Sequence, residues 1–275
     1  MRKRAEMNSG GKKVVILGCG WLGQIVGEAF TKKGISVFGS YRRPEVAEKL
    51  NKIGIHGFEL DYNTSSELTE SVIDQATHVF IFITPSSSKR VSYETLVSEL
   101  AEQFFPTTKF IFSSSTGVYP KDSGVYDESY SIDPNLPNRL FPAESALRKQ
   151  LGERLTILRL AGLIGPKRHP AHTLSGRELS NNGMNPINLI HANDIVLAIE
   201  RLMEIDHFGH TYNLVNPNHT SKKTYYTMAA EHFGIEPPLF GSEMAENRLI
   251  IGNAIEGDTS FRYRHPIDNF DDFLR

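Results

Sequence analysis

The chain has 275 residues, of which 39% are hydrophobic and 23% charged, a composition typical of a folded globular protein. With 30 Lys and Arg against 32 Asp and Glu, the net charge of −2 provides no global field for nucleic acid or an anionic membrane, so we expect neither as a partner. A single cysteine, Cys19, excludes an internal disulfide. Because no apolar run approaches the roughly 20 residues of a membrane span and no secretory signal is recognisable, we expect a cytoplasmic protein.

The N-terminal region predicts a strand, a helix and a second strand. Residues 1–12 lack a hydrophobic pattern, and we expect a flexible tail there. The continuous apolar run at 14–17 predicts a strand buried on both faces. A helical pattern over 21–33 ends at Gly34, and apolar residues at 35–38 predict the next strand, which completes a unit of about 30 residues.

The turn between the first strand and the helix reads GCGWLG, which spaces three glycines as G-x-G-x-x-G. Gly18 permits the tight turn, Gly20 lets the backbone approach a pyrophosphate, and Gly23 allows close packing of helix on strand. The amides of Trp21 and Leu22 at the helix start would meet the phosphate charge. Because the whole strand–helix–strand unit surrounds them, these glycines predict a dinucleotide site rather than a turn without ligand.

The end of the second predicted strand bears on the choice of cofactor. NAD sites usually have an acidic residue there, which accepts hydrogen bonds from the ribose hydroxyls. This chain has Ser40, Arg42 and Arg43 instead, with no acid before Glu45. Hydroxyl and guanidinium groups can bind the 2′-phosphate that a carboxylate would repel, although two arginines can also be simply solvated. The pattern therefore favours NADP over NAD.

The alternation of strands and helices continues and predicts the fold class. Further apolar runs at 56–60, 78–84, 109–113 and 155–160 are separated by segments long enough for crossover helices, such as 91–105. This pattern is typical of an α/β fold with a Rossmann doubly wound parallel sheet. Ligands of such sheets bind outside the carboxyl ends of the strands.

Four later segments resemble the extended short-chain dehydrogenases/reductases of the NAD(P)-dependent epimerase/dehydratase superfamily. These are FIFSSSTGVYP at 110–120, RLAGLIGP at 159–166, NLIHANDIVLAI at 188–199 and HTYNLVN at 210–216. With the glycine loop, they span nearly the whole chain in the family's order. The resemblance implies cofactor contacts beyond the glycine loop and the strand end already named, at Asp61, Tyr62, Thr84, Pro85, Ser113, Ser114 and Leu163.

The catalytic residues depart from the family pattern. Relatives use a Ser or Thr with a Tyr-x-x-x-Lys pair as a proton relay, in which the lysine lowers the pKa of the tyrosine. Ser115 matches the hydroxyl position, but the tyrosine and lysine positions fall near Arg139 and Ala143. The chain thus resembles an atypical branch that lacks this pair. Other candidates for proton transfer are nearby in sequence, namely Tyr119, Tyr126, Arg139 and Lys149, whereas Ser145 with Lys149 reads as a solvated helix face.

The C-terminal part predicts a small mixed α/β substrate cap. We assign 13–160, with parts of 187–216, to the Rossmann domain and mainly 161–275 to the cap. In the loop-rich segment 165–186, Arg168 and His169 are candidates for binding a substrate, together with Tyr119. His169 and His172 lack a third ligand, so we read them as surface histidines and expect no metal site.

Helical patterns follow this loop. His191 and Asp194 begin an amphipathic helix in which Asp194 suits the helix dipole. A second helix is predicted at 221–233, with Tyr225, Met228 and Ala229 in the core, and a final short one at 266–274.

Three functions remain open at this stage. The first is an NADP-dependent oxidoreductase or epimerase/dehydratase with unusual proton chemistry, acting on a small polar molecule such as a nucleotide-sugar. The second is a non-catalytic NADP(H)-binding sensor or scaffold. A serine hydrolase is disfavoured because no G-x-S-x-G occurs. Relatives often dimerise, so the resemblance also allows a homodimer.

Overall fold

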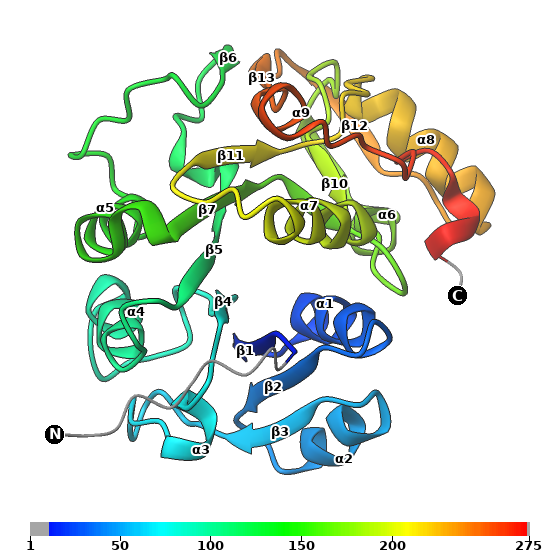
Figure 1. Ribbon diagram of the computed structural model, residues 1–275. Coiled ribbons are helices and arrows are strands. Elements are labelled where there is room, and N and C mark those ends of the chain that lie inside the picture. Colours follow the sequence, from blue (N-terminus) through cyan, green and yellow to red (C-terminus); the bar gives the residue numbers. More distant parts are fainter. Residues whose placement is uncertain (1–10, 274–275) are drawn as a thin grey trace, which may run out of the picture. The chain divides into compact units, whose positions relative to one another are not determined.

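The computed structural model describes residues 11–273, which form two compact units (Figure 1). The N-terminal unit ends at Ile111, and the C-terminal unit begins at Phe112. Most of the predicted tail, residues 1–10, lies outside the described residues, as do residues 274–275.

Strands and helices alternate through the N-terminal unit. Its elements are β1 (Lys13–Leu17), α1 (Trp21–Thr31), β2 (Ser36–Tyr41), α2 (Glu45–Lys52), β3 (His56–Glu59), α3 (Glu70–Ile73), β4 (His78–Ile81), α4 (Tyr93–Glu102) and the first half of β5 (Lys109–Ser115). Strand β1 pairs in parallel with β2 and β4, and β2 pairs in parallel with β3. Helices α1 and α2 cover one face of these strands, and α4 lies on the other (Figure 1).

The hydrophobic pattern explains these elements. Val14, Val15, Ile16 and Leu17 are all fully buried, as expected for a central strand covered on both faces. Helix α1 turns Val26 and Phe30 into the core. Helix α4 is capped by Ser92, whose side chain accepts a hydrogen bond from the Thr95 amide.

Seven parallel strands make up one sheet, in the order β11-β7-β5-β4-β1-β2-β3. The chain reverses direction along the sheet between β3 and β4, because β4 returns to pair with the other edge of β1. This reversal is the mark of a doubly wound sheet, so the predicted fold class is confirmed.

The C-terminal unit contains the remaining elements. They are η1 (Thr116–Val118), β6 (Gly124–Tyr126), α5 (Leu140–Leu151), η2 (Gly152–Arg154), β7 (Leu155–Leu160), β8 (Gly162–Ile164), α6 (Pro170–Leu174), β9 (Glu178–Asn181), β10 (Leu189–His191), α7 (Ala192–Glu204), β11 (Thr211–Leu214), α8 (Lys222–Phe233), β12 (Leu239–Glu243), β13 (Arg248–Ile250), α9 (Ala254–Thr259) and η3 (Phe270–Phe273). Helices α5 and α7 lie on opposite sides of β7 (Figure 1). Three pairs of short strands, β10 with β8, β12 with β9 and β13 with β6, complete the unit.

Two details of the predicted helices need correction. Tyr225 and Ala229 of α8 are buried in the core, but Met228 is 46% exposed and was wrongly placed there. The final segment forms only the single 3₁₀ turn η3, which packs Phe270 and Phe273 against α8.

The start of α7 also differs in detail from the prediction. His191 is the N-cap, and its Nδ1 accepts a hydrogen bond from the Asn193 amide at 3.2 Å. Asp194 is fully buried and accepts bonds from the backbone amides of Arg264 and His265 instead. The C-terminal segment is therefore fastened to α7 by a buried carboxylate.

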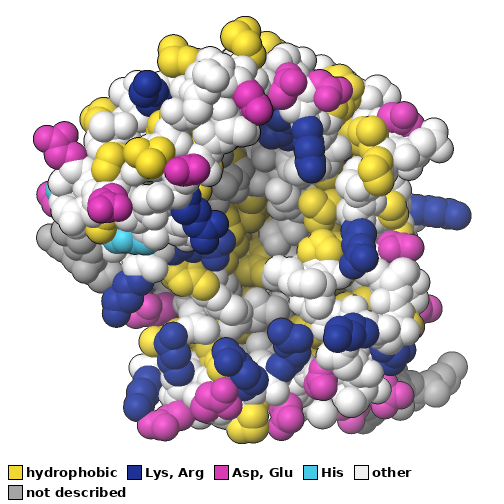
Figure 2. Space-filling model, turned by 180° about the vertical axis from the view of Figure 1, so that it is seen from behind, with side chains coloured by type: hydrophobic (Ala, Val, Ile, Leu, Met, Phe, Trp, Pro, Cys, Tyr) yellow, Lys and Arg dark blue, Asp and Glu magenta, His cyan; other side chains and the backbone are white. Residues whose placement is uncertain are grey.

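Charged side chains of both signs are interspersed over the face drawn in Figure 2, in keeping with the near balance of the composition. Within residues 11–273, no helix is both long and apolar enough to span a membrane.

Candidate functional site

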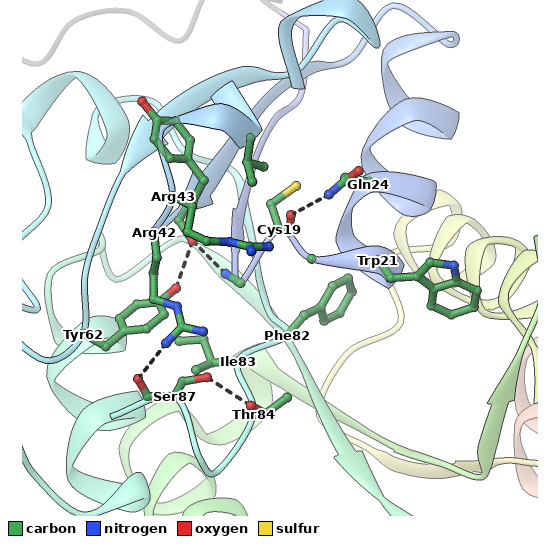
Figure 3. A pocket seen from close by; sticks show the side chains of 15 residues that line it. Cys19, Trp21, Gln24, Arg42, Arg43, Tyr62, Phe82, Ile83, Thr84 and Ser87 are labelled. Carbon is green, nitrogen blue, oxygen red and sulfur yellow. Dashed lines mark hydrogen bonds between the residues drawn. The ribbon is translucent and has the colours of Figure 1, made fainter. Parts of the chain in front are cut away.

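A pocket of about 320 Å³ opens at the carboxyl ends of β1, β2 and β4 in the N-terminal unit (Figure 3). The ends of these strands and the turns that follow them supply its walls. Its lining residues are Gly18, Cys19, Gly20, Trp21, Gln24, Ser40, Tyr41, Arg42, Arg43, Val46, Tyr62, Phe82, Ile83, Thr84 and Ser87.

Each of the three glycines in the loop is explained by a different feature of the structure. Gly18 has φ +90°, and a Cβ there would lie 2.8 Å from the Ile83 amide nitrogen, so only glycine fits. A Cβ on Gly23 would lie 3.1 Å from the Gly18 carbonyl oxygen and 3.2 Å from Ile16, which explains the close packing of α1 on β1. A Cβ on Gly20 would meet nothing within 4 Å, so the backbone there faces open space that a ligand can enter.

The open side of Gly20 is also the amino end of α1. Gly20 is the N-cap and has no side chain to accept a hydrogen bond from the first-turn amides. The partial positive charge of an 11-residue helix therefore faces the pocket. This arrangement fits a phosphate group, as the sequence predicted for this loop.

A buried pair of hydroxyls holds the glycine loop in place. The Ser40 Oγ accepts the Gly18 amide hydrogen at 2.8 Å and shares a 2.9 Å hydrogen bond with the Tyr62 hydroxyl. Ser40 is 3% exposed and Tyr62 also 3%, and burial raises the pKa of Tyr62 to about 12. The Ser40 hydroxyl is thus engaged with the loop and positions it, while a direct contact of Ser40 with a cofactor phosphate stays a prediction.

Two exposed arginines follow β2 at the rim of the pocket (Figure 3). The Arg42 Nη1 makes a long hydrogen bond of 3.4 Å to the Ser87 carbonyl, and the Arg43 Nε lies 3.6 Å from a carboxylate oxygen of Glu45. The Arg42 contact is long and partly buried, and the Arg43 contact is exposed to water. Both are weak, so either guanidinium can turn toward a ligand. None of the 15 lining residues that the structure describes is acidic.

The remaining predicted cofactor residues of this unit are distributed around the pocket. The exposed Thr84 lines it, whereas Leu22, Asp61 and Pro85 are not among the lining residues. Asp61 accepts hydrogen bonds from the backbone and side chain of Asn63, which lower its pKa. Contacts from these residues to a cofactor stay predictions.

Cys19 lies inside the loop and is 3% exposed. Burial raises the pKa of its thiol to about 12, so the sulfur is protonated at neutral pH and is a poor nucleophile. This agrees with a filling role for the side chain.

The C-terminal unit contains a second polar centre, built around a buried ion pair. Arg159 on β7 donates from Nη2 to an oxygen of Glu144 on α5 at 2.7 Å, with the two side chains 8% and 3% exposed. Ser114 on β5 donates to the other Glu144 oxygen at 2.5 Å. The Tyr119 hydroxyl accepts from Arg159 Nη1 at 2.9 Å and lies 2.8 Å from Oδ1 of Asn213.

This network occupies the hydroxyls that the sequence offered for catalysis and substrate binding. Tyr119 is 2% exposed with its hydroxyl fully engaged, and Tyr126, which is 5% exposed, donates from its hydroxyl to the Asp122 carbonyl at 3.2 Å. Burial raises the pKa of both tyrosines. Neither hydroxyl is free to meet a substrate in this arrangement, which does not favour Tyr119 as a substrate contact.

Of the three consecutive serines, Ser114 is engaged with Glu144, whereas Ser115 keeps hydrogen-bonding capacity to spare. It is half-buried at the end of β5, and its Oγ accepts the Gly117 amide hydrogen at 3.0 Å, which leaves the hydroxyl hydrogen free to be donated. The half-buried Ser113 precedes the engaged Ser114. At the positions where the relay pair was expected, Arg139 is exposed and Ala143 is fully buried.

The predicted substrate residues lie in different surroundings. Arg168 is exposed, and Leu163 on β8 is half-buried. His169 is 5% exposed and packs against Phe233, Phe270 and Phe273, so it is not the surface histidine that we expected. Burial lowers its pKa to about 4.

His169 also has a structural role at α6. Its Nδ1 accepts the Ala171 amide hydrogen at 3.2 Å, and its Nε2 lies 2.8 Å from the Tyr225 hydroxyl, which itself donates to the Ile267 carbonyl. The imidazole thus caps α6 and joins it to α8. The neighbouring His172 is exposed, as predicted. The predicted solvated face of α5 is also found, because Ser145 and Lys149 are both exposed.

Two residues of the pocket and of the buried ion pair were not predicted from the sequence. Glu144 was not singled out, although it follows the expected lysine position and neutralises the arginine of the RLAGLIGP segment. Gln24 of α1 lines the pocket, where its amide donates to the Cys19 carbonyl at 3.3 Å. Gln24 lies one turn after Gly20 in the helix, and this spacing was the available signal.

Comparisons with known proteins agree with this architecture. The sequence model of the NAD dependent epimerase/dehydratase family matches residues 14–215. Protein YeeZ of Escherichia coli K12 is 29% identical over 266 residues, covering 93% of this chain and 97% of that protein.

Solved structures show the same fold at low sequence identity. UDP-glucuronic acid 4-epimerase from Bacillus cereus, in complex with NAD, is 16% identical with a TM-score of 0.77, covering 95% of this chain and 97% of that one. Vestitone reductase from alfalfa is 18% identical with a TM-score of 0.74, covering 96% of each chain.

Proposed function

Because the chain belongs to the NAD dependent epimerase/dehydratase family, we propose that it is an enzyme that binds NADP(H) in the pocket of its N-terminal unit. The observation that supports NADP over NAD is the rim of this pocket. Arg42 and Arg43 follow β2 there, and no described lining residue is acidic.

The charges at the rim explain the expected preference. A carboxylate would accept hydrogen bonds from the two ribose hydroxyls of NAD but would repel a 2′-phosphate. Arg42 and Arg43 can instead donate charge-assisted hydrogen bonds to that phosphate, each worth about 1.5–3 kcal/mol. Glu45 competes for Arg43, so we assign the larger share to Arg42.

We propose a redox or epimerase/dehydratase-type reaction at a carbonyl or alcohol group of a small polar substrate. The nicotinamide of the cofactor would supply or accept a hydride. Ser115 is the residue that we place at the reacting oxygen, because its hydroxyl hydrogen is free to donate while its oxygen is held by the Gly117 amide. In a reduction, solvent would supply the proton that the substrate oxygen gains.

Arg168 supports a polar or anionic substrate, because it is exposed beside the segment that the family uses for its substrate cleft. A nucleotide-sugar fits this proposal, and one neighbour in fold is a UDP-glucuronic acid 4-epimerase. Other carbonyl compounds remain within the same class, since another neighbour is vestitone reductase.

One observation favours a second candidate function, a non-catalytic NADP(H) sensor. The hydroxyls of Tyr119 and Tyr126 are both buried and engaged, and no tyrosine–lysine relay occurs at the expected positions. Such a protein would bind the cofactor through the same pocket and turn over no substrate.

Calorimetry on the whole chain tests the cofactor assignment. We expect NADPH to bind more tightly than NADH, and the double variant Arg42→Ala/Arg43→Ala to lose at least tenfold in NADPH affinity with little change for NADH. The matched control is Lys49→Ala/Lys52→Ala, which removes two exposed charges of α2 outside the pocket. Tighter binding of NADH by the natural chain would overturn the assignment.

A turnover screen separates the enzyme from the sensor. NADPH oxidation would be followed against a panel of carbonyl compounds that includes oxidised nucleotide-sugars. With an active compound in hand, Ser115→Ala is expected to lower kcat and leave NADPH affinity unchanged. Unchanged turnover in that variant would remove Ser115 from the mechanism, and tight NADPH binding with no turnover across the panel would favour the sensor.

A further inference from the structure

We propose that the C-terminal unit binds a divalent transition-metal ion, Zn²⁺ in the first instance, through His207, His210 and Asp258. His207 follows α7, His210 directly precedes β11, and Asp258 belongs to α9. One potential ligand atom from each of the three lies within 4.8 Å of the other two. The proposal departs from the expectation of no metal site, which considered only His169 and His172.

A buried tyrosine orients two of the three ligands. Tyr212 is 1% exposed, and its hydroxyl donates to Oδ2 of Asp258 at 2.9 Å. Because that hydrogen is committed to Asp258, the 2.9 Å contact between the Tyr212 oxygen and Nε2 of His207 must be donated by the imidazole. A neutral His207 then has its proton on Nε2 and a free lone pair on Nδ1, the form in which histidine binds metals.

The third ligand is held close by stacking and by its backbone. The rings of His207 and His210 are 4.3 Å apart between centroids and nearly parallel, at 5°. The His210 carbonyl accepts hydrogen bonds from the Ile157 amide at 2.9 Å and from Arg148 at 3.0 Å. The His210 backbone is thus fixed to β7 and α5, while its exposed ring can turn.

The ligand set selects the ion. Two imidazole nitrogens and one carboxylate suit Zn²⁺, which binds such groups at about 2.0–2.2 Å. Ca²⁺ and Mg²⁺ prefer six or more oxygen ligands, which these residues do not provide. Tetrahedral ligands around zinc are about 3.3 Å apart, so the ligand atoms need to approach by at most about 1.5 Å, which the exposed side chains of His210 and Asp258 can do by rotation. Water would complete the coordination.

A metal bound here would connect the turn before β11 to α9, two segments about 50 residues apart in the sequence. It would therefore stabilise the folded C-terminal unit by binding to it and not to the unfolded chain. The site shares no residue with the proposed NADP(H) pocket or with Ser115, so its test is independent of the proposed function.

The test uses the full chain, freed of metal by a chelator and titrated with Zn²⁺ in a calorimeter. We expect one site per chain and a rise in the thermal unfolding midpoint on adding Zn²⁺. His210→Ala and Asp258→Asn should each weaken binding at least tenfold and abolish that rise. Tyr212→Phe should weaken it about 10- to 100-fold, because outer-shell partners of metal ligands have effects of this size.

His172→Ala is the matched control. His172 is an exposed histidine that also stands three residues from another one, and its loss should leave the Zn²⁺ affinity unchanged. Circular dichroism confirms that each variant is folded, and the exposed positions of His210 and Asp258 make this outcome expected. Absence of a saturable site, or equal Zn²⁺ affinity in the natural chain, His210→Ala and Asp258→Asn, would overturn the proposal.

Discussion

Breaking the Arg159–Glu144 pair should destabilise the protein far more than breaking a surface pair of the same geometry. The side chains are 8% and 3% exposed, and Arg159 makes its contact of 2.7 Å to Glu144 where water is almost excluded. Arg159→Met leaves the Glu144 carboxylate buried, with the Ser114 hydroxyl as its remaining side-chain hydrogen-bond donor among the described residues. Removing one member of such a buried pair costs about 3–5 kcal/mol of unfolding free energy.

The chain offers a matched control in Arg90 and Glu99. Their contact is also 2.7 Å, but the side chains are 32% and 35% exposed. Water solvates the remaining carboxylate when Arg90 is replaced, so Arg90→Met should cost about 1 kcal/mol or less. The two variants therefore differ in burial and share the same N–O distance.

Urea unfolding followed by circular dichroism measures both costs, taken from the midpoint and the slope of each transition. The double variant Arg159→Met/Glu144→Leu removes both charges and should be more stable than Arg159→Met alone. A cost near 1 kcal/mol for Arg159→Met, equal to that of Arg90→Met, would refute the reasoning, because it would mean that water reaches the buried pair.

Two further predictions concern other residues of the fold. The folded pKa of His169 is lowered to about 4, below the usual 6.5, so the unfolded state takes up the proton first as the pH falls from about 6.5 to about 4. The free energy of unfolding should therefore decrease as the pH falls across this window. His169→Asn, which keeps a capping side chain, should flatten this dependence in urea titrations, and an unchanged dependence in that variant would contradict the prediction. Gly18→Ala should lower the free energy of unfolding more than Gly34→Ala does. Both glycines have positive φ, but only at Gly18 would a Cβ lie 2.8 Å from backbone atoms. Equal losses of unfolding free energy in the two variants would contradict this prediction.

The sequence was sufficient for the architecture of the proposed NADP(H) pocket because its signals are local. The apolar run of β1, the glycine spacing and the position of Arg42 and Arg43 after β2 are all read within 30 residues of chain. Ser40 was singled out from the same residues, but its hydrogen-bond partners were not predicted. Its contact with Tyr62 joins residues 22 positions apart, and only the folded chain brings these two hydroxyls together.

The C-terminal unit was harder to predict because its polar groups meet over long distances in the sequence. Tyr119 and Asn213 are 94 residues apart, and Asp194 binds amides about 70 residues later. His169 followed a Lys-Arg pair in a polar loop, which suggested exposure, yet the aromatic side chains that bury it come from α8 and η3. Hydropathy of neighbouring residues carries no information about such partners.

Recognition of a 2′-phosphate by Arg42 and Arg43 can be measured with two fragments of the cofactor. Binding of adenosine 2′,5′-bisphosphate and of adenosine 5′-monophosphate would be compared by calorimetry on the natural chain and on Arg42→Ala/Arg43→Ala. We predict that the natural chain binds the bisphosphate at least tenfold more tightly than the monophosphate and that the variant loses this difference. Equal affinity of the two fragments for the natural chain would contradict it.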